Sequence, residues 1–114
     1  MRFKILIFTC SIISTLLLIQ SAVAKVNPEV DPNVDLNKGK RIYQQTCAMC
    51  HGRNAEKHAF DSSAIIAQMP ANEIITALEK RKNGEIEGAG NSVKARLSEQ
   101  DMQNVAAYVE SLTK

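Results

Sequence analysis

The stretch CAMCH, residues 47–51, places two cysteines three positions apart and a histidine directly after the second. Two thiols and an imidazole this close together can act as a redox pair, as part of a metal site, as a disulfide, or as the attachment point of a cofactor. The third cysteine of the chain, Cys10, lies in the apolar segment at the N-terminus. The rest of the sequence therefore has to separate these four alternatives.

Three of the four alternatives leave part of the stretch unexplained. A dithiol redox pair is typical of a βαβ setting, and no segment of this sequence alternates convincingly as a strand. A zinc site needs four ligands, and after removal of the N-terminal segment only His58 could join the three residues of the motif. A structural disulfide suits an oxidising compartment but leaves His51 without a role.

The fourth alternative gives all three residues a role. The pattern C-x-x-C-H is the attachment signature of c-type haem. Cys47 and Cys50 would each add across a vinyl group of the porphyrin, and His51 would ligate the iron as its proximal ligand. We therefore predict one covalently bound haem c per chain. Such a haem would also supply the apolar surface that a small domain with few aromatic residues lacks.

The N-terminal segment indicates export from the cytoplasm. Residues 1–24 begin with Arg2 and Lys4, continue as an apolar run and end on the small residues AVA. This order is typical of a secretory signal peptide, and the apolar run of about fifteen residues is shorter than the roughly twenty that span a bilayer. We expect cleavage after Ala24, no stable membrane anchor, and a periplasmic or secreted protein. The alternative is an anchor that stays attached.

The chain that remains after this cleavage is small and almost neutral. Removing 24 of 114 residues leaves 90, and removing Arg2 and Lys4 leaves 12 basic against 12 acidic residues. A neutral domain gives no reason to expect a nucleic-acid partner. We expect a monomer with an extended N-terminal arm over residues 25–35 and one domain over residues 36–114.

Apolar periodicity predicts an all-α fold with three main helices. The first is expected over residues 36–49 and runs into the cysteines. The second is expected over residues 70–84, with basic residues in its last turn and a glycine at its end. The third opens with a capping box at residues 98–101 and continues as an amphipathic helix. Residues 84–96, between the second and the third, are expected to form a loop.

Four segments of the chain resemble the class I c-type cytochromes. They are GKRIY (39–43), CAMCHG (47–52), ITALEKRKNG (75–84) and LSEQDMQNVAAYV (97–109). The resemblance covers most of residues 36–113 and implies a cytochrome c fold wrapped around one covalently attached haem. It also implies that Gly39 and Tyr108 lie where the first and last helices cross. Tyr43 and Tyr108 are expected to be ordinary core aromatics.

The chain departs from this family at the position of the sixth iron ligand. The family carries a methionine in the loop before the last helix, and residues 84–96 contain neither methionine nor histidine. The candidates for the distal position are Met69 and Asn91. Met102 is expected to pack in the core on the apolar stripe of the last helix, and His58 is expected to be exposed.

A second departure concerns the proximal histidine. The family often has a proline shortly after the haem motif, whose carbonyl orients the imidazole. Residues 53–67 contain no proline. The sequence therefore does not show how His51 is held.

The resemblance implies a soluble electron carrier, not an enzyme, which passes electrons between redox partner proteins outside the cytoplasm. The methionine-free loop motivates an alternative, a haem protein whose open or weakly held sixth site binds a small gaseous ligand. If the ferrous protein refuses carbon monoxide, a strong nitrogen ligand such as Lys94 or His58 holds the sixth position and this alternative is wrong. A third hypothesis is a small subunit docked on a larger redox enzyme.

Overall fold

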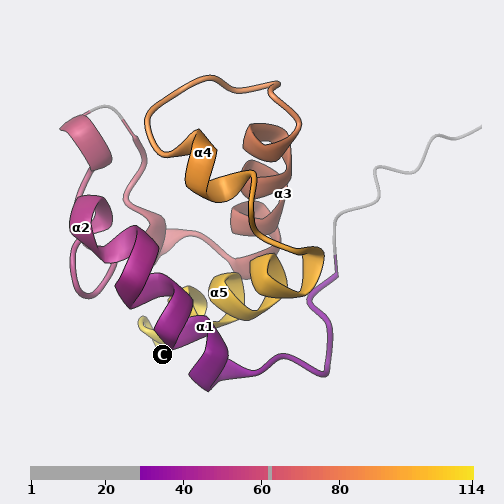
Figure 1. The fold of residues 1–114 in the computed structure, drawn as a ribbon. Helices are drawn as coiled ribbons and strands as arrows, with labels where there is room; N and C mark the ends of the chain where they lie inside the picture. The colour runs from indigo at the N-terminus through magenta and orange to yellow at the C-terminus, as the bar shows by residue number, and fades with distance from the viewer. Residues whose placement is uncertain (1–28, 62) are drawn as a thin grey trace, which may run out of the picture.

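The computed structural model describes residues 29–61 and 63–114, and every regular element within them is helical (Figure 1). The all-α prediction is therefore confirmed. The elements are α1 Leu36–Ile42, η1 Tyr43–Cys47, α2 Ala48–His51, η2 Ala59–Asp61, η3 Ile66–Gln68, α3 Ala71–Lys82, α4 Asn91–Lys94 and α5 Glu99–Ser111. The expected signal peptide, its cleavage site and the start of the arm lie outside the described residues. No helix in the described part of the chain has the length and apolar character needed to cross a bilayer.

α1, η1 and α2 follow one another without a break and carry the CAMCH stretch at their end. The run begins at Asp35, whose side chain accepts a hydrogen bond from the Lys38 backbone N–H at 2.9 Å, as helix N-caps do. It ends at Gly52, where a φ of 87° turns the chain away. The helix expected over residues 36–49 is confirmed, but the sequence did not indicate that η1 is a π-helix, a turn type that is frequent at functional sites.

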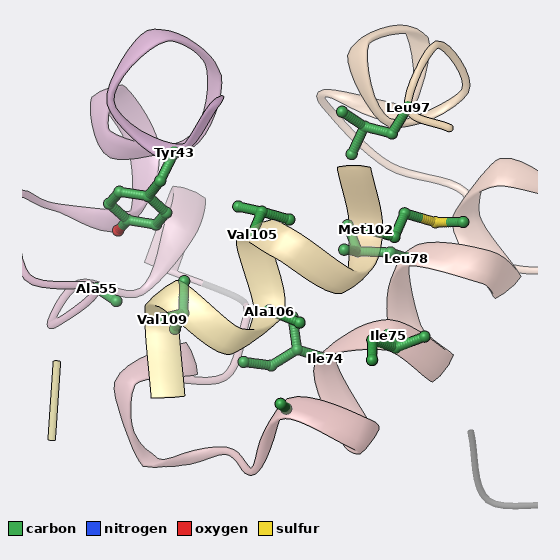
Figure 2. Packing of buried hydrophobic residues seen from close by; sticks show 11 residues of the cluster. Tyr43, Ala55, Ile74, Ile75, Leu78, Leu97, Met102, Val105, Ala106 and Val109 are labelled. Atoms are coloured by element: carbon green, nitrogen blue, oxygen red, sulfur yellow. The ribbon is translucent and has the colours of Figure 1, made fainter. Parts of the chain in front are cut away.

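α5 lies between α1 and α3 and packs against both (Figure 1). Its start is fixed by the expected capping box, in which the Ser98 hydroxyl accepts from the Asp101 N–H at 3.1 Å and the Asp101 carboxylate accepts from the Ser98 N–H at 3.3 Å. Figure 2 shows Tyr43 on one side of α5 and Leu78 of α3 on the other. Met102 is 2% exposed within this core, which confirms the packing role expected for it.

The crossing of α1 and α5 is as close as the resemblance implied. Gly39 is buried at this crossing. A Cβ placed on Gly39 would overlap the Asn104 carbonyl, coming within 2.6 Å of its carbon, and would lie 3.0 Å from the Tyr108 Cβ. Only glycine lets the two backbones approach this far. The prediction that Gly39 and Tyr108 meet at the helix crossing is confirmed.

The part of the N-terminal arm that the structure describes lies on α5. The Asp31 N–H donates to the Gln103 side chain at 3.0 Å, and the Asp35 N–H donates to the Asn104 side chain at 2.9 Å. The Asn104 side chain is 2% exposed. It thus joins the start of α1 to the middle of α5, a role that the sequence analysis missed.

The segment between α3 and α5 contains an element that was not predicted. α4, residues Asn91–Lys94, forms one helical turn within the expected loop 84–96. The turn starts at Gly90, which has a φ of 79° and so turns the chain into α4. The expectation of a plain loop was wrong over this turn, and α4 brings side chains to the cavity described next.

Candidate functional site

The CAMCH stretch borders a cavity of about 300 Å³. The cavity lies within the size range of small-molecule and cofactor sites, and most of its lining is apolar, as is usual for such sites. Its walls come from the helical run that holds the motif, from α3, from the segment around α4 and from α5. Representative lining residues are Cys47, Cys50, His51, Leu78, Lys94 and Val105. The fold therefore brings both thiols and the imidazole of the motif to one apolar cavity.

Cys47 and Cys50 are both free thiols and partly buried. Burial raises the pKa of the Cys47 thiol, while the Thr46 hydroxyl, 3.3 Å from its sulfur, acts in the opposite direction. A raised pKa keeps the thiol protonated and argues against an activated redox dithiol. Met49, between the two cysteines, is 92% exposed and does not line the cavity.

One nitrogen of the His51 imidazole makes no hydrogen bond within the described residues. Its Nδ1 is buried and, among the described residues, has no hydrogen-bond partner. Burial lowers the pKa of His51, and the positive charge of Lys94 lowers it further. The neutral imidazole that results is the form that ligates metals. Buried polar atoms are nearly always paired, so this nitrogen marks a ring whose bonding is incomplete without another group.

The backbone around His51 is held by groups from outside the motif. The Tyr43 hydroxyl, on a fully buried side chain, donates to the Gly52 carbonyl at 2.6 Å. The Lys57 N–H donates to the His51 carbonyl at 2.8 Å. Tyr43 is a core aromatic as expected, with its ring centroid 5.7 Å from that of Tyr108. Its hydroxyl adds a second role, which was not foreseen, by fixing the turn that follows the histidine.

Of the two residues named as candidates for the distal iron ligand, one lines the cavity and the other does not. Met69 lines the cavity. Asn91 does not line it: its amide donates to the Ile86 carbonyl at 2.6 Å and accepts from Arg81 of α3 at 3.3 Å. Two hydrogen bonds of this kind hold the side chain away from the cavity.

The two possible nitrogen ligands, His58 and Lys94, also differ in whether they line the cavity. His58 is exposed, lies outside the cavity lining, and its Nδ1 is 2.6 Å from the Ser63 carbonyl oxygen. Lys94 is partly buried and lines the cavity, and burial lowers the pKa of its amine. Only Lys94 of the two thus reaches the same cavity as Cys47 and Cys50.

The residues present fit a covalently attached haem. Two free thiols at the spacing of the attachment signature and a buried imidazole with an unpartnered nitrogen border an apolar cavity. The thiols would supply the thioether bonds, the imidazole would supply an iron ligand, and the apolar walls suit the porphyrin faces.

Comparison with known proteins gives a consistent result. The family model for cytochrome c matches residues 36–113. Cytochrome c-554(547) of Halothiobacillus neapolitanus is 33% identical over 90 residues, which cover 68% of this chain and 97% of that protein. Cytochrome c6 of a Synechocystis species is 36% identical over 80 residues, which cover 66% of this chain and 63% of that protein. The match spans all of the elements that line the cavity.

Proposed function

This chain belongs to the cytochrome c family, and we propose that it passes single electrons between redox partner proteins outside the cytoplasm. The family implies one covalently bound haem c, whose iron gains and loses one electron. The observation that carries the proposal is the CAMCH stretch at the edge of an apolar cavity inside a domain that matches the family along its length. No bond in a substrate needs to change for this function, so we propose a carrier and not an enzyme.

In this proposal the three motif residues hold the haem. Cys47 and Cys50 form the thioether bonds, and His51 is the proximal iron ligand. Apolar side chains such as Leu78 and Val105 keep water from the cavity, which helps set the potential of a buried iron. The hydrogen bond from Tyr43 to Gly52 keeps the residue after His51 in place. The alternative of a gas-binding haem protein gains no support from the names of the two relatives.

The carrier function is tested by a redox titration of the exported, haem-loaded protein. We expect one reversible couple with the slope of a one-electron transfer, and rapid oxidation of the ferrous protein by a soluble haem-protein acceptor. The absorption spectrum of the haem measures both the redox couple and the rate of oxidation. A couple that is not reversible, or a ferrous protein that reacts with carbon monoxide but passes no electron to the acceptor, would contradict the carrier proposal.

Export is tested on the same preparation. We propose that the protein outside the cytoplasm begins at Lys25, because AVA presents small residues to the signal peptidase. N-terminal sequencing of the periplasmic or secreted fraction should read KVNPE, and size-exclusion chromatography should give the mass of a monomer. A chain that starts at Met1 and sediments with membranes would favour the retained anchor.

A further inference from the structure

The wall that the α3–α5 connection contributes to the cavity contains two side chains able to bind a metal. Its lining residues lie within 87–97, and all but two of them are glycine or aliphatic. The two are Glu87 and Lys94. Glu87 is exposed, so its carboxylate keeps its hydration, whereas Lys94 is partly buried. Lys94 is therefore the less exposed of the two possible donors on this wall.

The amine of Lys94 uses little of its hydrogen-bonding capacity within the described part of the chain. Among residues 29–61 and 63–114, its Nζ makes one hydrogen bond, a long one of 3.3 Å to the Ala89 carbonyl. An ammonium can donate three hydrogen bonds, so most of its capacity is unused. Gly90 leaves the space beside it open, since a Cβ there would come within 3.1 Å of the Nζ. The absence of a side chain at Gly90 thus leaves room for the amine.

Lys94 also lies within electrostatic reach of the motif. The positive charge of Lys94 lowers the pKa of His51 and opposes the burial that raises the pKa of the Cys47 thiol. The shared cavity places Lys94 and the three motif residues around one space. Lys94 lies on α4 and His51 on α2, which are separate elements of the fold (Figure 1), and both residues line the cavity.

Met69, the remaining candidate, is tied to the segment that follows His51. The Ala67 N–H donates to the Ala55 carbonyl at 3.1 Å, two residues before Met69. Met69 also packs against the apolar core. Met69 thus divides its contacts between the apolar core and the cavity wall. An unbranched, polarizable Met in this position acts as a filler of core space.

We propose that the neutral amine of Lys94 is the sixth ligand of the haem iron. Ligation forms one iron–nitrogen bond and releases one proton from the ammonium to solvent. The inference rests on the proposed function, because it presupposes a haem held by Cys47, Cys50 and His51. It replaces the family's methionine by a nitrogen donor that a one-turn helix brings to the cavity.

An amine ligand changes properties that can be measured without any partner protein. A thioether ligand raises the potential of a c-type haem, so a haem with an amine in its place should have a lower potential. The ferric protein should be low-spin and should lack the near-infrared band of a sulfur–iron bond. Carbon monoxide has to displace the amine, which lowers its apparent affinity by the fraction of time the site is open.

The test compares four haem-loaded variants with the wild type: Lys94→Ala, Lys94→Arg, Lys94→Met and Lys80→Ala. Lys94→Ala should become high-spin or bind water, and its ferrous form should bind carbon monoxide about tenfold more tightly, the factor expected if the amine holds the iron about 90% of the time. Lys94→Arg keeps the positive charge but cannot ligate, because its guanidinium stays protonated, and should behave like Lys94→Ala. Lys94→Met should gain the sulfur band and a higher potential. The exposed Lys80 is a control, and its variant should match the wild type.

Two results would overturn the proposal. One is a wild type whose spin state and carbon monoxide affinity equal those of both Lys94→Ala and Lys94→Arg. The other is a wild type with a sulfur band that disappears in Met69→Ala, which would make Met69 the ligand. Mass spectrometry for bound haem and a redox titration accompany every sample. Loss of haem or of the one-electron couple in the wild type would instead contradict the proposed function, so the two failures are distinguishable.

Discussion

Replacing Cys47 and Cys50 together with alanine should abolish covalent haem attachment. Both sulfur atoms are free and partly buried at the edge of the cavity, and within the described residues they are the two cysteines available for thioether bonds. Mass spectrometry of the denatured wild type should show a chain heavier by one haem, and the double variant should show the chain alone. Haem that extracts freely from the wild type into acidified butanone would refute covalent attachment.

The double variant should also fail to fold stably. The cavity lies among α3, α4, α5 and the helical run that carries the motif, so an unfilled cavity leaves apolar walls of all these elements without contacts. A domain of this size has little other apolar surface with which to compensate. Circular dichroism should show reduced helicity, and limited proteolysis should be fast. Cys10→Ala is the matched control, since Cys10 lies in the expected signal peptide and its variant should keep the haem. Equal loss of haem in that control would trace the defect to export and not to attachment.

The elements that sequence reasoning found are those whose signals are local. α5 was predicted because its capping box at residues 98–101 and its apolar stripe can be read within one helix, and both are present. The helical run into the cysteines was predicted for the same reason. The type of turn in η1 was not, because a π turn depends on what the helix packs against and leaves no periodic signature. α4 was missed because four residues are too few for a pattern, and the turn depends on the left-handed backbone of Gly90.

In the candidate site, too, the features with a local sequence signal were predicted and those that depend on packing were not. The three motif residues were found from spacing alone, and whether they hold the haem remains a prediction. The hydrogen bonds that hold the turn after His51 and the start of the helical run that carries the motif were not found. The Tyr43 hydroxyl reaches the Gly52 carbonyl across a buried contact, and the Asn104 side chain accepts from the Asp35 N–H across 69 positions. Hydrogen bonds between distant segments are set by the packed fold, so a single sequence gives no sign of them.

The crossing of α1 and α5 is where one substitution should affect stability most. In Gly39→Ala, a Cβ gains about 1 kcal/mol in helix propensity over glycine. The same Cβ would overlap the backbone carbonyl of Asn104, which cannot rotate away as a flexible side chain could. The two helices must therefore separate, and the apolar contacts along their interface must loosen with them. The steric cost should outweigh the gain in propensity, and a larger side chain should increase it.

Gly39→Leu should accordingly destabilise the haem-loaded protein by about 1–3 kcal/mol or more, the cost of inserting extra methylenes into a packed interface. For a domain of this size, each kcal/mol lowers the melting temperature by about 4–8 °C. Lys40→Ala, at the neighbouring exposed position of α1, is the control and should melt with the wild type. Thermal unfolding followed by circular dichroism measures all three variants. If Gly39→Leu melted together with Lys40→Ala, the close contact between Gly39 and Asn104 would not be limiting, and the stability of the fold would have to come from α3 and α5 instead.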